Sequence, residues 1–187
     1  MSYHEFKDDS KVNSIEGHVK EIMKILGIRP DKESKDTPYR IAKMLTHEVF
    51  KYREDGDFDL SYLNSQMTVF PSPSQNPVTV KNIPFSSMCA HHWMPFFGKV
   101  DITYIPNEVV LGLSKFPRVV KFFSGRPQVQ ENLTSDIGKY LEEALGKPKY
   151  LRVVIHDTTH TCVLCRGAES DCSTDTVFEV GRKDSTL

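Results

Sequence analysis

The segment "GKVDITYIP" (residues 98–106) decides the fold class of this 187-residue chain. Its apolar residues Val100, Ile102 and Tyr104 alternate with polar ones, which is the pattern of a β-strand that buries one face and exposes the other. The preceding segment "VTVKNIPF" (78–85) has the same strand-like character. The sequence therefore predicts a sheet with one covered face.

Two helices are predicted before these strands. Apolar residues recur at helical spacing in "SIEGHVKEIMKIL" (14–26). In "DTPYRIAKMLTHEVF" (36–50), Thr37 suits the N-cap position and Pro38 suits the first turn. We expect an N-terminal helical extension.

Helices and strands also follow the central pair. "LSKFPRVVKFFSG" (113–125) predicts a short helix interrupted near Pro117, and "PQVQENLTSDIGKYLEEAL" (127–145) predicts a longer one with a buried apolar stripe. Further strands are expected in "YLRVVIHD" (150–157), "TCVLCRG" (161–167) and "DTVFEVG" (175–181). This order predicts an α+β fold, an antiparallel sheet with helices packed on one face. We divide the chain into an N-terminal helical region with a linker, residues 1–65, and one structural unit, residues 66–187.

Charge and cysteine content narrow the class of protein. The formal net charge is −1, so no general attraction to nucleic acid or to a membrane surface is expected. The N-terminus "MSYHEFKDDSK" is too polar for a signal peptide, and the apolar runs are shorter than a membrane span. We predict a cytoplasmic protein, in which the four cysteines are thiols or metal ligands and not disulfides.

The segment "SSMCAHHWMPFFGK" (86–99) contains half of a metal site, because Cys89 and His92 have the C-x-x-H spacing. Two completions are open. In a closed structural zinc site, Cys162 and Cys165 supply the other two ligands. In an open site only Cys162 joins the pair, and water takes the fourth position.

Strand geometry favours the open site. If "TCVLCR" is extended, Cys162 and Cys165 face opposite sides, because side chains alternate along a strand. His160, two residues before Cys162, would share its face. The histidines His91 and His160 would then remain as proton carriers beside the metal.

Charged residues elsewhere suit a phosphorylated base. Lys115 and Arg118 stand one helical turn apart, and Arg166 follows the last cysteine pair. Gln130 and Glu131 fall in the first turn of a predicted helix, where the helix dipole favours a carboxylate. A carboxylate can accept two parallel N–H donors, which guanine offers and adenine does not.

Several segments together resemble the GTP cyclohydrolase I family. They are "DTPYRIAKML", "MCAHH", "GKVDITYIPN", "VLGLSKFPRVV", "RPQVQENLT" and "HTCVLCRG", and the resemblance covers about residues 14 to 181. It implies the tunnelling fold (T-fold), in which sheets of neighbouring subunits join into a barrel, and a homodecamer of two pentameric rings. It also implies conversion of GTP and water to 7,8-dihydroneopterin triphosphate and formate.

The same resemblance implies roles for individual residues. The zinc ligands, for one zinc ion per subunit, would be Cys89, His92 and Cys162. The acid–base pair would be His91 and His160. The guanine ring would be held by Gln130 and Glu131. The triphosphate would contact Lys115, Arg118 and Arg166, with Ser114 lining the pocket and Arg40 reaching in from a neighbouring subunit.

Two departures from the family pattern keep rival functions open. Ala90 stands where an acidic residue is usual, and Asn132 stands where a basic one is usual. One rival is a zinc-stabilised nucleotide-binding or regulatory T-fold protein without turnover. The other is a related T-fold enzyme, a nitrile reductase that uses a cysteine nucleophile and NADPH.

Overall fold

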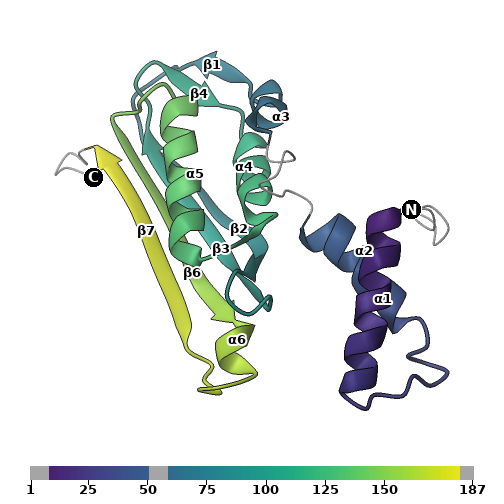
Figure 1. Cartoon of the computed structure of the whole chain (residues 1–187). Helices are drawn as coiled ribbons and strands as arrows, with labels where there is room; N and C mark the ends of the chain where they lie inside the picture. Colours follow the sequence, from purple (N-terminus) through teal and green to yellow (C-terminus); the bar gives the residue numbers. More distant parts are fainter. Residues whose placement is uncertain (1–8, 51–58, 182–187) are drawn as a thin grey trace. The chain divides into compact units, whose positions relative to one another are not determined.

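The computed structural model describes residues 9–50 and 59–181. The chain divides into two compact units, residues 1–53 and 54–187 (Figure 1). The first unit contains α1 (Ser10–Ile25), α2 (Thr37–Met44) and the π-helical turn η1 (Leu45–Val49). Both predicted N-terminal helices are thus confirmed. The first begins earlier than predicted because the Asp9 side chain caps it, accepting hydrogen bonds from the amides of Lys11 and Val12.

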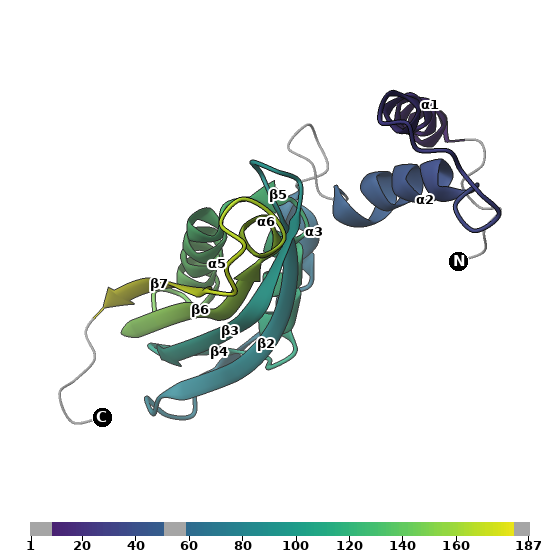
Figure 2. The ribbon, with the colours of Figure 1, turned by 90° about the horizontal axis from the view of Figure 1, so that it is seen from below.

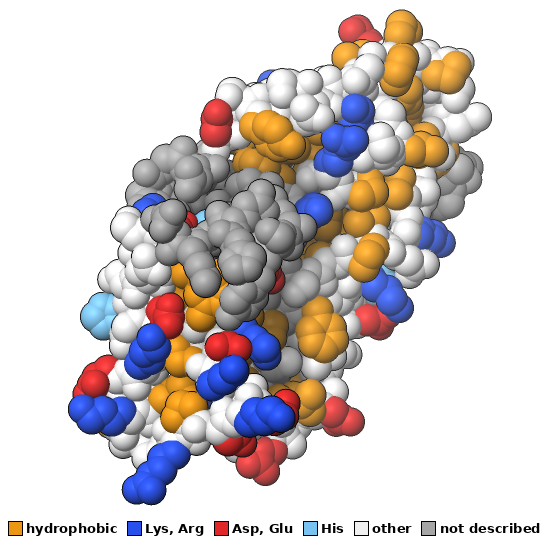
Figure 3. All heavy atoms as spheres, turned by 90° about the vertical axis from the view of Figure 1, so that its right-hand side faces the viewer, with side chains coloured by type: hydrophobic (Ala, Val, Ile, Leu, Met, Phe, Trp, Pro, Cys, Tyr) orange, Lys and Arg blue, Asp and Glu red, His pale blue; other side chains and the backbone are white. Residues whose placement is uncertain are grey.

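The two helices of this unit bury only a small core, which contains Val12, Tyr39 and Ala42. Three apolar side chains near the end of α1 stay exposed: Ile22 (55%), Ile25 (75%) and Leu26 (67%). Figure 3 shows hydrophobic side chains at the surface among charged ones on the face that it draws. Exposed apolar surface of this kind often marks a contact with another protein chain.

The second unit is built on a five-stranded sheet with strand order β5-β2-β3-β6-β7 (Figures 1 and 2). Its long strands are β2 (Val78–Cys89), β3 (Pro95–Ile105), β6 (Tyr150–His160) and β7 (Ser173–Gly181), each antiparallel to its neighbour. The short β5 (Pro127–Gln128) runs parallel to β2. A separate two-stranded sheet consists of β1 (Val69–Pro71) and β4 (Val109–Leu111).

Two helices cover one face of this sheet. In Figure 1, α4 (Lys115–Ser124) and α5 (Gln130–Ala144) lie side by side on it, and a short α3 (Leu60–Ser65) precedes the strands. The predicted α+β class with helices on one face is confirmed. The predicted interruption near Pro117 is wrong, because the first turn of a helix needs no intrahelical partner for the missing proline N–H.

The core lies between the sheet and these helices. The predicted inward face of β3 is confirmed, since Val100 and Ile102 are fully buried and Tyr104 is 1% exposed. Residues of α4 and α5 meet this face with fully buried side chains: Phe116, Val119, Leu133, Ile137 and Leu141. Among the helices described, none is long and apolar enough to cross a membrane.

Strand β2 contains a bulge. Val80 pairs with Ile102, and Ile83 pairs with Val100, so two residues of β2 stand against one of β3. The second of these two residues, Asn82, has a positive φ of 57°. An extra residue of this kind shifts the later side chains of the strand to the opposite face.

Strand β6 contains a second bulge. Lys99 pairs with His156, and Phe97 pairs with Thr159, so two residues of β6 stand against one of β3. The first of them, Asp157, has a positive φ of 52°. The side chains of β6 after this bulge, up to His160 at the end of the strand, therefore also shift to the opposite face.

Gly138 sets the distance between α5 and β7. A Cβ atom at this position would collide with the Phe178 ring. We expect Gly138→Ala to lower the free energy of unfolding by about 1–3 kcal/mol through overpacking. Urea unfolding followed by circular dichroism measures this change. Gly17→Ala is the control, because nothing lies within 4 Å of its added Cβ, and an unchanged stability for Gly138→Ala would contradict the close packing.

Candidate active site

Three side chains form a group that could hold a metal ion: Cys89, His92 and Cys162. Their ligand atoms all lie within 4.8 Å of one another, and the two sulfur atoms are 3.9 Å apart. Both cysteines are buried, whereas His92 is exposed. Two thiolates, which are soft donors, and one imidazole form a ligand set typical of zinc sites.

A tight turn after β2 positions the first two of these residues. The Cys89 amide donates a hydrogen bond of 2.9 Å to the Met94 carbonyl, and the Trp93 amide donates one of 2.9 Å to the Cys89 carbonyl. Trp93 has a positive φ of 52°, which closes the turn. His91 lies in the same turn, with its Nδ1 atom 3.9 Å from the Cys89 sulfur.

The third residue lies on a helix and not on a strand. The segment predicted as a strand at 161–167 instead begins with α6 (Thr161–Leu164), so that prediction is wrong. The Thr161 hydroxyl donates a hydrogen bond of 2.6 Å to the Pro95 carbonyl, which holds the chain at the turn out of β6. Cys165 is exposed, and within the described part of the chain the candidate metal group does not include it. The geometry thus matches the open ligand set, although the strand argument for it fails.

His160 lies at the end of β6 in a defined orientation. Its ring stacks on Phe96 with centroids 4.8 Å apart, and its Nε2 atom is 2.8 Å from Oε1 of Gln130. The Gln130 amide nitrogen donates to the Thr174 carbonyl and to the Thr176 hydroxyl, both at 3.1 Å. Since the amide N–H groups are used there, its oxygen must accept, and the Nε2 atom of His160 carries the proton.

Burial controls the titration of these groups. It lowers the pKa of His160, and the negative charge of Glu131 opposes this shift. It raises the pKa of the Cys162 thiol, and the neighbouring Cys89 raises it further, whereas Arg166 lowers it. The protein alone therefore favours a neutral imidazole and a protonated thiol, and a bound cation would favour the thiolate.

The predicted phosphate contacts lie on other elements. Ser114 precedes α4, Lys115 begins it, and Arg118 follows one turn later, where its Nη1 atom donates to Oε1 of Gln66 at 2.9 Å. Arg40 is exposed on α2 in the N-terminal unit. Within the second unit, over the described residues 59–181, no hydrogen bond or ion pair connects Ser114, Lys115 or Arg118 to the candidate metal group.

The sequence reading missed Gln128, which supports the turn after Cys89. This buried side chain donates from Nε2 to the Phe123 carbonyl at 2.6 Å and to the Ser87 hydroxyl at 3.1 Å. The backbone carbonyl of Gln128 accepts a hydrogen bond of 3.1 Å from the Ala90 amide. No spacing or charge pattern distinguishes it in "PQVQ", so only the folded structure reveals its role.

The chain is similar to several known proteins along most of its length. Residues 15–185 match the family described as GTP cyclohydrolase I. The chain is 38% identical to the GTP cyclohydrolase 1 of Erwinia tasmaniensis over 95% of its own length and 78% of the relative's. It is 37% identical to the enzymes of that name from Citrobacter koseri and Escherichia coli K12, with the same coverage. A solved structure, the archaeosine synthase QueF-Like in its apo form, has a TM-score of 0.47 and 23% identity, covering 59% of this chain and 98% of that one.

Proposed function

This chain belongs to the GTP cyclohydrolase I family, and we propose that it converts GTP and water to 7,8-dihydroneopterin triphosphate and formate. The identity of 38% over 95% of the chain supports this enzymatic function. The observation that carries it is the convergence of Cys89, His92 and Cys162, the last of which follows the half-buried His160 by two residues. We assign the catalytic region to residues 66–187.

The metal of this site is proposed to be zinc, one ion per subunit. Two buried cysteines and one histidine suit zinc, and three protein ligands leave one coordination position for water or substrate. When bound, the ion would lower the pKa of that water and so supply a nucleophile for C8 of the purine. The turn that contains Cys89 and His92 and the helix that contains Cys162 bring the three side chains together, which supports this proposal.

His160 is proposed to protonate N7 of the purine. Its Nε2 proton faces Gln130, so transfer to the substrate would use Nδ1 of the imidazolium. His91, at the exposed edge of the turn, is assigned to the later ring-opening and closing steps. These two residues form the proposed acid–base pair.

Guanine is proposed to bind at the start of α5. Glu131 is exposed in the first turn, where it could accept both N–H donors of the ring edge. Gln130 is also assigned to guanine, through its backbone, because its side-chain amide is already bonded to His160 and to β7. The first amides of a helix have no intrahelical partners and are available for such a contact.

The triphosphate is proposed to contact Lys115, Arg118 and Arg166, with Ser114 at the pocket wall. Arg40 is assigned to the same triphosphate from a neighbouring subunit. This assignment requires an oligomer, and we propose a homodecamer of two pentameric rings. The position of β7 at the end of the sheet and the exposed apolar residues of α1 support association, because unpaired strand edges and apolar patches are common interaction surfaces. We also propose that the protein is cytoplasmic.

Product analysis tests this function directly. The full-length protein, loaded with zinc, is incubated with GTP, and formate and the fluorescence of the oxidised pterin are measured. We expect equal amounts of both products and their loss when a chelator is added. Tight GTP binding without formate would indicate the regulatory alternative, and consumption of NADPH with a nitrile substrate would indicate the reductase.

A further inference from the structure

The bulge in β2 decides which face of the sheet carries Cys89. Val80 and Ile83 pair with neighbouring inward residues of β3, although they are three positions apart. Every second residue from Ile83 onward then faces the helices, and this series ends at Cys89, which is buried. In a regular strand continuing from Val80, Cys89 would lie on the opposite face.

The bulge in β6 has the same effect on His160. Ile155 and Thr158 are both completely buried and three positions apart, so the alternation changes between them. His160 therefore lies on the face covered by α5, where it meets Gln130. Without the extra residue it would point away from that helix. Both bulges are thus needed to gather the candidate site on one face.

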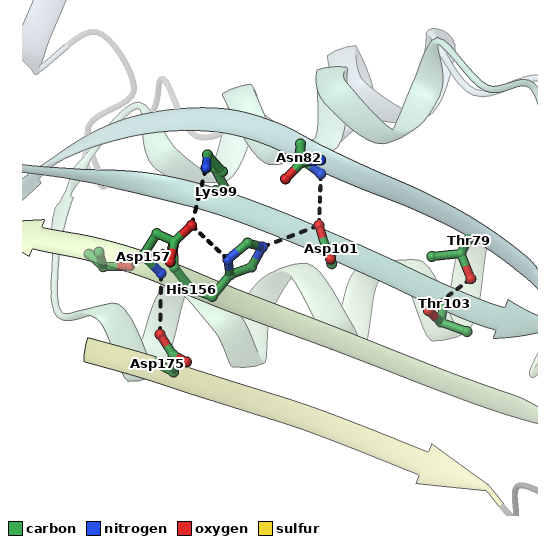
Figure 4. Close-up of polar contacts among 9 residues, drawn as sticks. Thr79, Asn82, Lys99, Asp101, Thr103, His156, Asp157 and Asp175 are labelled. Atoms are coloured by element: carbon green, nitrogen blue, oxygen red, sulfur yellow. Dashed lines mark hydrogen bonds and ion pairs between the residues drawn. The ribbon is translucent and has the colours of Figure 1, made fainter. Parts of the chain in front are cut away.

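One network of side chains, drawn in Figure 4, connects the two bulges across the opposite face of the sheet. Oδ1 of Asp101 accepts a hydrogen bond of 2.7 Å from the Asn82 amide and lies 3.2 Å from Nε2 of His156. Nδ1 of His156 lies 3.3 Å from Oδ2 of Asp157. The Asp157 amide donates a hydrogen bond of 3.2 Å to Oδ1 of Asp175. Asn82 and Asp157, the two bulge residues with positive φ, therefore each donate their backbone N–H to a carboxylate.

The charges of this network keep its carboxylates ionised. Burial raises the pKa of Asp101, but the hydrogen bond from Asn82 and the proximity of His156 and Lys81 outweigh it, and the pKa is lowered overall. The hydrogen bond and charge of Lys99, whose Nζ lies 3.1 Å from Oδ2 of Asp157, lower the pKa of the Asp157 carboxyl. Both groups act as acceptors at neutral pH.

Strand β3 has Gly98 opposite the bulge of β6, where the two backbones approach closely. A Cβ atom at Gly98 would lie 2.8 Å from the His156 carbonyl and 2.8 Å from the Thr158 hydroxyl. A contact that close forbids any larger side chain at this position without movement of the backbone. The bulge is therefore packed into the sheet and is not a loose irregularity.

We propose that Asp101 and His156 are positioning residues for the active site. They hold the bulges of β2 and β6 together, and the bulges place Cys89 and His160 on the face covered by α5. Neither residue touches the candidate metal group, so they act through the backbone. This inference rests on the proposed function, in which Cys89 is a metal ligand and His160 an acid–base residue, so that their positions affect catalysis.

The test combines kinetics with amide exchange. Asp101→Ala removes the acceptor for the Asn82 amide and for His156. We expect kcat for formate release to fall about 10–100-fold, as for a small displacement of catalytic groups, with KM for GTP changed less than about twofold. Hydrogen–deuterium exchange in peptides covering residues 78–89 and 150–160 should become faster. Asp101→Asn keeps an oxygen acceptor and should recover most of kcat.

Thr103→Val is the matched control on the same face. It removes the 3.1 Å hydrogen bond between the Thr79 and Thr103 hydroxyls, which lies outside both bulges (Figure 4), and should leave kcat unchanged. If Asp101→Ala does not fold, His156→Gln serves instead, with an expected loss of about 3–10-fold in kcat.

Two results would overturn the inference. One is a wild-type kcat in both Asp101→Ala and His156→Gln. The other is a lower kcat with unchanged exchange in the two peptides, because the effect would then not pass through the bulges. If the wild-type protein itself releases no formate, the proposed function fails, and the exchange measurement still decides whether Asp101 holds the bulges.

Discussion

Cys162→Ser is expected to remove the bound metal and to lower formate release by more than about a hundredfold. Changes to residues that only support a metal ligand cost about 10–100-fold, so loss of a ligand should cost more. The change leaves only Cys89 and His92 as soft donors, because a serine hydroxyl binds zinc poorly at neutral pH. Metal content by atomic emission and formate release are measured on the same preparation.

Cys165→Ser provides the matched control for this change. Cys165 is exposed and lies three residues further on, outside the candidate metal group. We expect its metal content and turnover to equal those of the wild type. Loss of metal in Cys165→Ser would instead support the closed four-ligand site and contradict the proposed open coordination.

His160→Ala is expected to lower kcat by about 10²–10⁴-fold, the usual contribution of a general acid or base. The bound metal should remain, because the His160 ring contacts Gln130 and Phe96 and is not one of the three candidate ligands. Formate and pterin are measured at saturating GTP, together with metal content.

His18→Ala is the control for a general effect of histidine removal, since His18 is exposed on α1. It should leave kcat unchanged. A His160→Ala protein with metal and near wild-type turnover would refute the acid–base role. Loss of metal from this variant would show that its effect is structural.

Much of the fold could be predicted because burial leaves a periodic trace. In β3, Val100, Ile102 and Tyr104 alternate with polar residues, and the pairing of this stretch with β6 is regular. The prediction of α4 is wrong only in its interruption near Pro117, because a proline in the first turn is compatible with a continuous helix.

The error at α6 has a different cause. Val163 and Leu164 are apolar, and a short apolar run fits either a strand or a helical turn. The chain leaves the sheet after His160, the last residue of β6 that pairs with β3. Local propensity does not reveal this exit. The predicted ligand set with Cys162 therefore agrees with the candidate metal group, although the local structure predicted for Cys162 is wrong.

The bulges were missed although the sequence contains a trace of them. Inward residues normally recur at even spacing, and both Val80 to Ile83 and Ile155 to Thr158 are separated by three. His156 belongs to none of the motifs in the sequence. Its importance depends on Asp101, which is distant in sequence, so no local pattern could have revealed it.

The hydrogen bonds of the Gln130 side chain connect Thr174 and Thr176 of the outermost strand, β7, to the imidazole of His160. If subunits associate along β7, as proposed, the contact involves the strand that accepts the hydrogen bonds of Gln130. Turnover would then depend on protein concentration, because dilution would separate the subunits and change the surroundings of this strand.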